Sequence, residues 1–305
     1  MRVTVLGDFM IDEYIYSTTS RISPEAPVLI ADVQEIVEKP GGAGNTAQAL
    51  INLQNEVQLI GFNDTENKIK DLFPDKKCVK SFINMDLKAI RKTRIVADGH
   101  HLLRIDNEKI PCHIDFSQIE TLMNRLISFN PDIIVISDYN KGFLRLLLEY
   151  KEFCVFFSRF IRNVPVVADL KPKSFHLIRG TISTAFHSIL PNQKEIMESA
   201  DFCNTYYDAA VFWHDQMIAD HIIVTRAADG ASMIIGHEEH KIPAEIIEVV
   251  DVCGCGDNVT AVYTHLLVRG VEPLEALKKA VKAATFTAQR LGTHPISLME
   301  LNAII

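Results

Sequence analysis

The sequence lacks the long apolar run that a membrane-spanning helix requires. Its most apolar stretches, Ile133–Ser137 and Ile222–Thr225, have the length of a strand and fall far short of ~20 residues. The first eight residues also lack the apolar core and the small-residue cleavage site of a secretory signal. We therefore expect a cytoplasmic protein that has no membrane partner.

Cysteines with zinc-type or redox-type spacing are missing as well. The six cysteines form no CxxC pair, and Cys253 and Cys255 stand too close in sequence for a structural disulfide. Basic residues are also fewer than acidic ones: the chain has 31 Lys and Arg residues and 39 Asp and Glu residues, which gives a net charge of −8. This sign argues against a non-specific nucleic-acid binder.

The chain does have a composition typical of a globular protein, with 48% hydrophobic and 23% charged residues over 305 positions. Short apolar runs predict strands over residues 3–6, 57–61, 133–137, 164–169, 188–190 and 221–225. Helical patterns lie at residues 43–53, 116–128, 144–161, 206–219, 258–269, 273–291 and 297–304. Such alternation predicts an α/β fold with a parallel sheet and crossover helices.

Two segments interrupt the alternation of strands and helices. Residues 13–36 and 90–106 alternate in the manner of strands, yet neither is followed by its own helix. We expect these segments to form a small β-lid over one end of the main sheet. Because no repeat or linker is visible, we expect residues 1–305 to form a single domain.

A first glycine-rich segment, Pro40–Asn45, opens a predicted helix. Glycines at this place let backbone N–H groups approach a ligand, although a tight strand-to-helix turn explains them equally well. Asn45 favours a functional role, because its amide can both donate hydrogen bonds to a polyol and accept them.

A second segment, Asp251–Asp257, carries more information. It follows an apolar run at 246–250 that predicts a strand, and it precedes a helix that begins near Asn258. Gly254 and Gly256 permit a nest of N–H groups at the helix N-terminus, which suits an anion. Asp257 is either an N-cap or a general base. We favour the base, because phosphoryl transfer needs a carboxylate beside an anion site. Neither GxxxxGK[ST] nor GxGxxG occurs, which excludes the commonest nucleotide-binding classes.

Taken together, these residues resemble the ribokinase (PfkB) family of sugar kinases. The resemblance rests on Gly41, Gly42 and Asn45 near the N-terminus and on Gly254–Asp257 near the C-terminus. A narrower similarity, to the kinases of D-glycero-β-D-manno-heptose 7-phosphate, rests on residues 7–12, 21–28, 92–94, 103–106, 137–142, 191–195 and 224–226. The run RISPEAPV at 21–28 is the most specific of these. The similarity extends from residue 2 to about residue 301.

The resemblance implies a ribokinase-like fold, with a mostly parallel central sheet flanked by helices and a small β-lid. It implies that ATP phosphorylates the anomeric hydroxyl of the heptose 7-phosphate, which yields the 1,7-bisphosphate used in ADP-heptose and lipopolysaccharide core synthesis. It further implies ATP and Mg²⁺ as cofactors, a small-molecule sugar phosphate as substrate, and a homodimer formed through the lid.

Site residues are assigned by the resemblance position by position. Asp257 matches the catalytic base, and the backbone of Gly254, Cys255 and Gly256 matches the anion hole. On the sugar side stand Asp8, Asp12, Gly42, Asn45, Asp138 and Lys141. On the nucleotide side stand Asp169, Lys171, Asn192, Glu195, Thr225, Arg226 and Gly230, of which Asn192 and Glu195 are the expected Mg²⁺ residues, acting through water.

The predicted lid also carries cations, which we expect to bind the phosphate of the substrate. They are Arg91, Lys92, Arg94 and Arg104. For each of them a solvated lid face is the alternative explanation.

The chain departs from the family pattern at several positions. Cys253 and Cys255 replace the usual Thr and Ala, Leu170 replaces a Pro, and Asn63–Asp64 match the Gly–Asp element of the family poorly. Two alternatives therefore stay open: a kinase for another sugar or phosphosugar, and a weakly active sugar-nucleotide-binding protein. Because no nucleotidyltransferase segment follows residue 305, we expect a version with the kinase activity alone.

Overall fold

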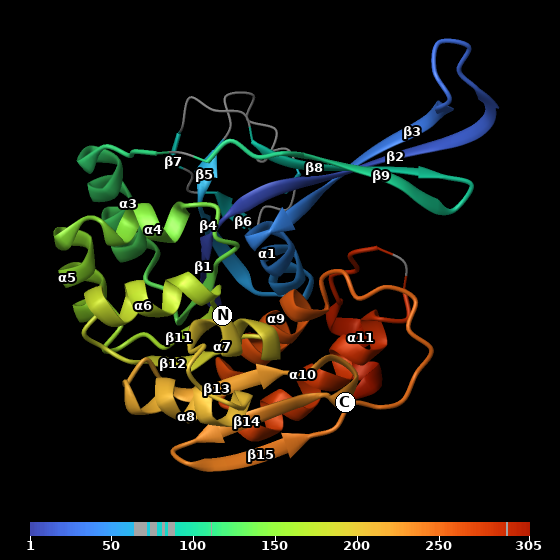
Figure 1. Cartoon of the computed structure of the whole chain (residues 1–305). Coiled ribbons are helices and arrows are strands. Elements are labelled where there is room, and N and C mark those ends of the chain that lie inside the picture. Colours follow the sequence, from blue (N-terminus) through green and yellow to red (C-terminus); the bar gives the residue numbers. More distant parts are fainter. Residues whose placement is uncertain (64–71, 74–77, 81–82, 85–88, 111, 291) are drawn as a thin grey trace.

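The computed structural model describes residues 1–63, 72–73, 78–80, 83–84, 89–110, 112–290 and 292–305. Its main sheet has the strand order β15-β14-β13-β12-β11-β10-β1-β4-β6 (Figure 1). The strands are β1 (Arg2–Gly7), β4 (Glu56–Ile60), β6 (Cys78–Lys80), β10 (Ile133–Ser137), β11 (Val166–Asp169), β12 (Phe186–Ile189), β13 (Ala219–Thr225), β14 (Ala231–Ile235) and β15 (Glu238–Ile242). From β6 to β13 neighbouring strands are parallel, and the hairpin β14–β15 adds an antiparallel edge.

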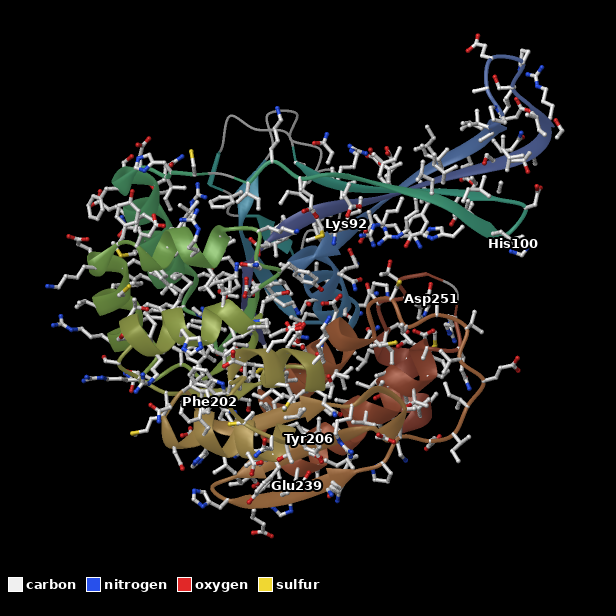
Figure 2. All side chains as sticks on the ribbon, in the orientation of Figure 1. Lys92, His100, Phe202, Tyr206, Glu239 and Asp251 are labelled. Atoms are coloured by element: carbon white, nitrogen blue, oxygen red, sulfur yellow. The ribbon has the colours of Figure 1, made fainter. Side chains whose placement is uncertain are left out.

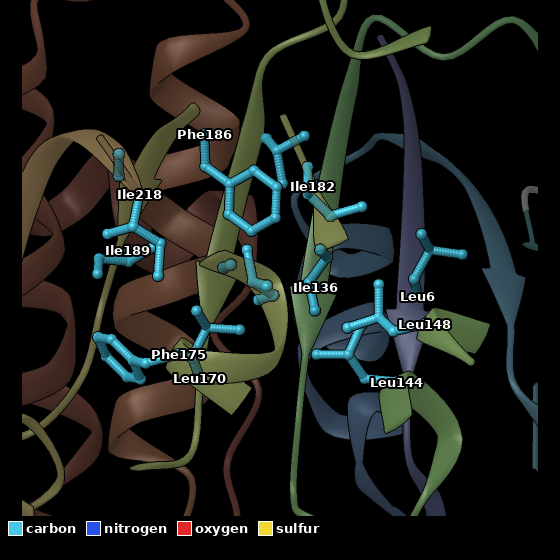
Figure 3. Packing of buried hydrophobic residues seen from close by; sticks show 14 of the residues in the cluster. Leu6, Ile136, Leu144, Leu148, Leu170, Phe175, Ile182, Phe186, Ile189 and Ile218 are labelled. Carbon is cyan, nitrogen blue, oxygen red and sulfur yellow. The ribbon is translucent and has the colours of Figure 1, made fainter. Parts of the chain in front are cut away.

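Helices cover both faces of this sheet (Figure 1). They are α1 (Ala43–Asn52), α3 (Phe116–Phe129), α4 (Phe143–Leu148), α5 (Lys151–Phe160), α6 (Pro172–Thr181), α7 (Gln193–Ser199), α8 (Tyr206–Asp215), α9 (Cys255–Leu267), α10 (Pro273–Thr287) and α11 (Leu298–Ile304). Strand alternation divides the core, so that Val5 packs with α1, α9 and α10 while its neighbour Leu6 packs with α3 to α8. Figure 3 shows the second cluster, in which Leu6 and Ile136 lie near Leu144 and Leu148 of α4.

A second sheet, the lid sheet, has the order β3-β2-β8-β9 and extends away from the main body (Figure 1). It consists of β2 (Phe9–Ile22), β3 (Leu29–Gly42), β8 (Ile90–Ala97) and β9 (His100–Asn107). The short strands β5 (Phe62–Asn63) and β7 (Ile83–Asn84) pair separately. β2 follows β1 after one residue, and β3 leads directly into α1, so both ends of this hairpin are fixed at the carboxyl edge of the main sheet. The predicted α/β class with a small β-lid is confirmed.

Three predicted elements are wrong. The helix expected over 144–161 is split into α4 and α5, because Tyr150 is extended between them and its hydroxyl reaches the carbonyl of Ile114. The helix expected over 206–219 ends at Asp215, since Ala219 already begins β13. The strand expected over 246–250 is irregular chain, because its apolar residues pair with no neighbouring strand and Ile246 is exposed.

Other elements were not predicted at all. They are α6, α7, the short strands β5, β6 and β7, and the antiparallel hairpin β14–β15. The helix expected over 273–291 ends at Thr287. Asp64 and Leu291, which took part in two sequence predictions, lie outside the described residues.

Candidate active site

Asp257 lies in the first turn of α9, and three side chains donate hydrogen bonds to its carboxylate. Nδ2 of Asn45 donates to Oδ2 (2.6 Å), whereas Oγ1 of Thr46 and the hydroxyl of Tyr139 donate to Oδ1 (3.1 and 2.7 Å). Burial raises the pKa of Asp257, and these donors act in the opposite direction. The carboxylate is therefore buried, oriented and poised to accept a proton.

The N-terminus of α9 is shaped by Gly254. Its φ of 77° is left-handed, and a Cβ here would stand 2.7 Å from Nδ2 of Asn45, so glycine is required at this position. The N–H of Cys255 donates to the carbonyl of Val252 (3.2 Å). Within the described chain, the N–H groups of Gly256 and of the residue after it have no protein acceptor, as the first turn of a helix dictates. The N–H of Gly254 likewise has no acceptor among the described residues, whereas the N–H of Cys255 is engaged.

A cavity of about 890 Å³ opens beside this helix end. Its lining combines polar side chains with mostly apolar ones from the 244–252 segment and from α10. Of the predicted residues, the cavity is lined by Asp169, Lys171, Asn192, Glu195, Thr225, Arg226, Gly230, Gly254, Cys255, Gly256 and Asp257. The structure thus brings together every residue that was predicted for the nucleotide side and for the helix N-terminus.

In the lining of the cavity, Lys171 bridges two carboxylates. Its Nζ lies 3.2 Å from Oδ1 of Asp169 and 2.7 Å from Oε1 of Glu195. Burial raises the pKa of Asp169 to about 7, although the charge of Lys171 opposes the shift. Asn192 and Glu195 form a reciprocal capping box at the start of α7, with both bonds at 2.9 Å. Both oxygens of Glu195 are therefore engaged within the protein.

The turn after β13 forms another wall of the cavity. The N–H of Thr225 donates to the carbonyl of Pro191 (3.0 Å), and that of Arg226 donates to the carbonyl of Gly230 (2.7 Å). The guanidinium of Arg226 lies 5.4 Å from the ring centroid of Tyr206, which is labelled in Figure 2. Backbone hydrogen bonds thus close this turn and tie it to the chain before α7.

The carboxylate of Asp8 accepts hydrogen bonds from the backbone of the loop after β10. Its Oδ2 accepts the N–H groups of Tyr139 and Lys141 (both 2.9 Å), and its Oδ1 accepts that of Phe143 (3.0 Å). Burial, with a contribution from the neighbouring Asp138, raises the pKa of Asp8 to about 6. The sugar contact predicted for Asp8 would have to use an oxygen that already binds this loop.

The carboxylate of Asp138 also accepts hydrogen bonds from nearby residues. It accepts the N–H of Asn140 (2.8 Å) on Oδ1, and on Oδ2 the N–H of Lys171 (3.0 Å) and the hydroxyl of Ser174 (2.6 Å). The carboxylate therefore ties the loop after β10 to the start of α6, and it does not line the cavity.

Asp12 and Arg94 share the face of the lid sheet that is turned toward the body. Nη1 of Arg94 donates to Oδ1 of Asp12 (2.5 Å), and its guanidinium lies 5.3 Å from the centroid of the Tyr14 ring. A Cβ placed on Gly292 would stand 3.9 Å from the Tyr14 hydroxyl, so this face meets the segment that follows α10. Gly42 ends β3 with a φ of 57° and leads into the helix that carries Asn45.

Lys92 and Arg104 lie on the same face of the lid sheet. Arg104 is the register partner of Arg94, and directly opposed residues share a face. Arg104 is exposed and forms two 2.9 Å bonds to the carboxylate of Asp106. Lys92 has no anionic partner among the described residues, and Figure 2 shows it where the lid sheet joins the body.

Two other predicted cations are engaged elsewhere. Arg91 lies on the opposite face of the lid sheet, where it pairs with Glu13 (2.6 Å) and with Glu38. Lys141 pairs with Glu108 (2.6 Å). The expected cluster of four lid cations is therefore corrected to three, because strand alternation separates Arg91 from its neighbours.

Sequence reasoning missed two partners of Asp257, namely Thr46 and Tyr139. Thr46 follows Asn45 in the first turn of α1, just after the glycine motif, and is not part of that motif. Tyr139 follows β10, and the rule that parallel strands end at one edge of a sheet could have found it.

The fold is ribokinase-like. The chain superposes on ribokinase from Thermotoga maritima with a TM-score of 0.72 at 19% identity, over 99% of this chain and 98% of that one. It superposes on phosphofructokinase-2 from Escherichia coli, crystallised with potassium, with a TM-score of 0.78 at 16% identity, over 99% and 97% of the two chains. At these identities the likeness shows the fold alone.

Sequence comparison identifies the family. Residues 147–299 match the pfkB family carbohydrate kinases. The chain belongs to this family and is an ATP-dependent carbohydrate kinase, as predicted. It is similar to bifunctional protein HldE of Psychromonas ingrahamii (30% identity over 312 residues) and of Haemophilus influenzae strain PittEE (32% over 313 residues), in each case over 99% of this chain. It spans 63% of the length of these relatives. No helix in the described part of the chain has the length and apolarity needed to cross a membrane.

Proposed function

We propose that the protein transfers the γ-phosphoryl group of ATP to the anomeric hydroxyl of D-glycero-β-D-manno-heptose 7-phosphate. The heptose assignment is supported by the sequence runs quoted above and by similarity to HldE over 99% of the chain. The observation that carries the reaction is the Asp257 carboxylate, buried among three donors at the N-terminus of α9 and lining the large cavity.

In this proposal Asp257 is the general base. Oδ1 already accepts two hydrogen bonds, whereas Oδ2 accepts one from Asn45, so Oδ2 retains a lone pair for the hydroxyl of the sugar. As the hydroxyl oxygen attacks the γ-phosphorus, its proton passes to Asp257, and the bond between the γ-phosphorus and the bridging oxygen breaks to release ADP. Burial strengthens the base, because it raises the pKa of Asp257.

The start of α9 and Lys171 would stabilise the moving phosphoryl group. The free N–H groups of Gly256 and Asp257 point out of a helix N-terminus, where the dipole favours an anion. Lys171 supplies a fixed positive charge that lines the same cavity. The apolar lining residues, among them Val249, Val281 and Ala284, suit the base of the nucleotide.

The residues present fit a weakly held Mg²⁺. Among the described residues no group of three His, Cys, Asp or Glu side chains could hold a metal ion. Mg²⁺ commonly keeps its waters and binds one or two carboxylates together with substrate phosphates, and Asp169 and Glu195 offer those carboxylates. Bound Mg²⁺ would neutralise charge on the phosphates of ATP. Asn192 would act on it only through Glu195 or water, because its Oδ1 caps α7.

The lid sheet would bind the phosphate of the sugar. Lys92, Arg94 and Arg104 share the face that carries Asp12 and is turned toward the body. Arginine binds phosphate in a bidentate manner, and the carboxylates that now engage Arg94 and Arg104 hold those side chains in place.

A coupled ADP-release assay tests the proposed substrate. The panel contains the heptose 7-phosphate, the same heptose without its phosphate, other phosphosugars and a water blank, with an Asp257→Asn preparation as background. We expect the highest kcat/KM with the heptose 7-phosphate. Preferred turnover of an unphosphorylated or different sugar would refute the substrate, and ADP release no faster than the blank would indicate a binding protein.

A further inference from the structure

Tyr139 joins the two halves of the site. It follows β10, its ring lines the cavity, and its hydroxyl donates to Oδ1 of Asp257 (2.7 Å). On the cavity side, Nζ of Lys171 lies 5.2 Å from the ring centroid. One side chain therefore contacts both the carboxylate and the cation of the site.

The backbone of Tyr139 is fixed before its side chain is considered. Its N–H donates to Oδ2 of Asp8, which also accepts the N–H of Lys141 (both 2.9 Å). The same loop is tied to the start of α6 through Asp138. Two buried carboxylates thus hold this loop, and the direction of the phenol follows from the fold.

We propose that Tyr139 is a positioning residue, which occupies Oδ1 of Asp257 and leaves Oδ2 as the oxygen that takes the proton of the sugar. This inference rests on the proposed role of Asp257 as base. Oδ1 receives Thr46 and Tyr139, so its two acceptor positions are filled. Without the phenol, either oxygen could take the proton, and the geometry toward the incoming hydroxyl would be less defined.

The protonation states agree with this role. Burial raises the pKa of Tyr139 well above its usual value, so the phenol remains a donor and does not act as the base. Its hydrogen bond lowers the pKa of Asp257 against the effect of burial. The other ionisable groups that act on this carboxylate are Lys171, which favours ionisation, and Asp169 and Cys255, which oppose it.

The pH profile of Tyr139→Phe tests the inference. Loss of a hydrogen bond to a charged acceptor should move the acidic limb of kcat/KM upward by about one pH unit. The KM for ATP should change little, because the ring and its contact with Lys171 remain. Tyr263→Phe is the matched control: this buried tyrosine of α9 bonds Ser188 (2.8 Å) and does not contact Asp257, so its profile should stay in place.

Two further measurements test the role of Tyr139 independently of the Tyr139→Phe variant and of turnover. If Tyr139→Phe does not fold, 3-fluorotyrosine at position 139 keeps the ring and makes the phenol a stronger donor, so the acidic limb should move downward. Aspartate labelled with ¹³C at Cγ reports the pKa of Asp257 without turnover, its signal being the one that Asp257→Asn lacks.

The outcomes separate this inference from the proposed function. Parallel shifts of the Asp257 signal and of the acidic limb support both. An unshifted Asp257 signal in Tyr139→Phe overturns the role of Tyr139, while a turnover defect in Asp257→Asn would still support the base. A shifted signal with an unmoved acidic limb shows that Asp257 is not the base, and the role of Tyr139 in the reaction falls with it.

Discussion

Replacing Asp257 with Asn should remove the proposed base and leave the architecture almost unchanged. Asn retains one oxygen, which can keep the hydrogen bonds from Thr46 and Tyr139 at the position of Oδ1. Its new NH₂ group would face Nδ2 of Asn45, 2.6 Å from the former Oδ2, and the clash is relieved when the amide of Asn45 turns over and presents its oxygen. All three hydrogen bonds are therefore restored after one amide rotation.

The expected result is a kinetic defect without a folding defect. A positioned general base contributes ~10²–10⁴ in rate, so kcat should fall by that factor, or about 3–5 kcal/mol of transition-state stabilisation. The pKa of Asp257 is raised in the folded protein, so the stabilisation that its protonated form provides is lost as the pH rises. At pH 7.5 a neutral Asn therefore does not lower the free energy of unfolding through this effect. The melting temperature should stay within about 2–4 °C, and ATP binding should be retained.

Kinetics, ATP binding and melting are measured on one preparation of Asp257→Asn. If Asp257 were only a helix cap, turnover would be near normal and the defect would appear in thermal unfolding. A kcat within a few-fold of the parent would refute the reasoning.

Three other predictions follow from the same geometry. Arg94→Ala should raise the KM for the sugar phosphate more than that for ATP, whereas Arg91→Ala, on the opposite face, should change neither, and equal effects would contradict the assigned faces. Cys255→Ala should keep most of its turnover, because burial raises the pKa of the thiol and leaves it unreactive; lost turnover in a folded variant would give the sulfur a role. The pKa of Asp169 rises from 3.8 to about 7, so its stabilising effect is lost as the pH rises across that range. The melting temperature of the parent minus that of Asp169→Asn should fall over this range, and an increase would contradict the assignment.

The glycine motifs predicted a helix N-terminus close to where α9 begins, because the backbone preference of glycine is local. Gly254 has a positive φ and directly precedes the N-terminus of α9. The first N–H groups of a helix lack an acceptor within the helix whatever its sequence. The contact between Asn45 and Asp257, 212 positions apart in sequence, follows from the two helices α1 and α9 packing on one face of the sheet. The resemblance placed both residues in the same site, and residue patterns alone did not.

What was missed depended on which way side chains point. Arg91 and Arg94 occupy odd and even positions of β8 and therefore lie on opposite faces, which a grouping of cations by sequence proximity alone does not capture. The partners of Asp8 are backbone N–H groups, which no sequence motif displays. The apolar run at 246–250 predicts a strand, but its side chains instead line the cavity or face solvent.

The position of the new phosphate on the product tests the central claim most directly. The parent protein is incubated with ATP, Mg²⁺ and the heptose 7-phosphate, and the product is analysed by ³¹P and ¹H NMR. We predict a second phosphate coupled to the anomeric proton, at a rate that falls by ~10²–10⁴ in Asp257→Asn. A phosphate on any other carbon, or equal rates for the two proteins, would contradict the account.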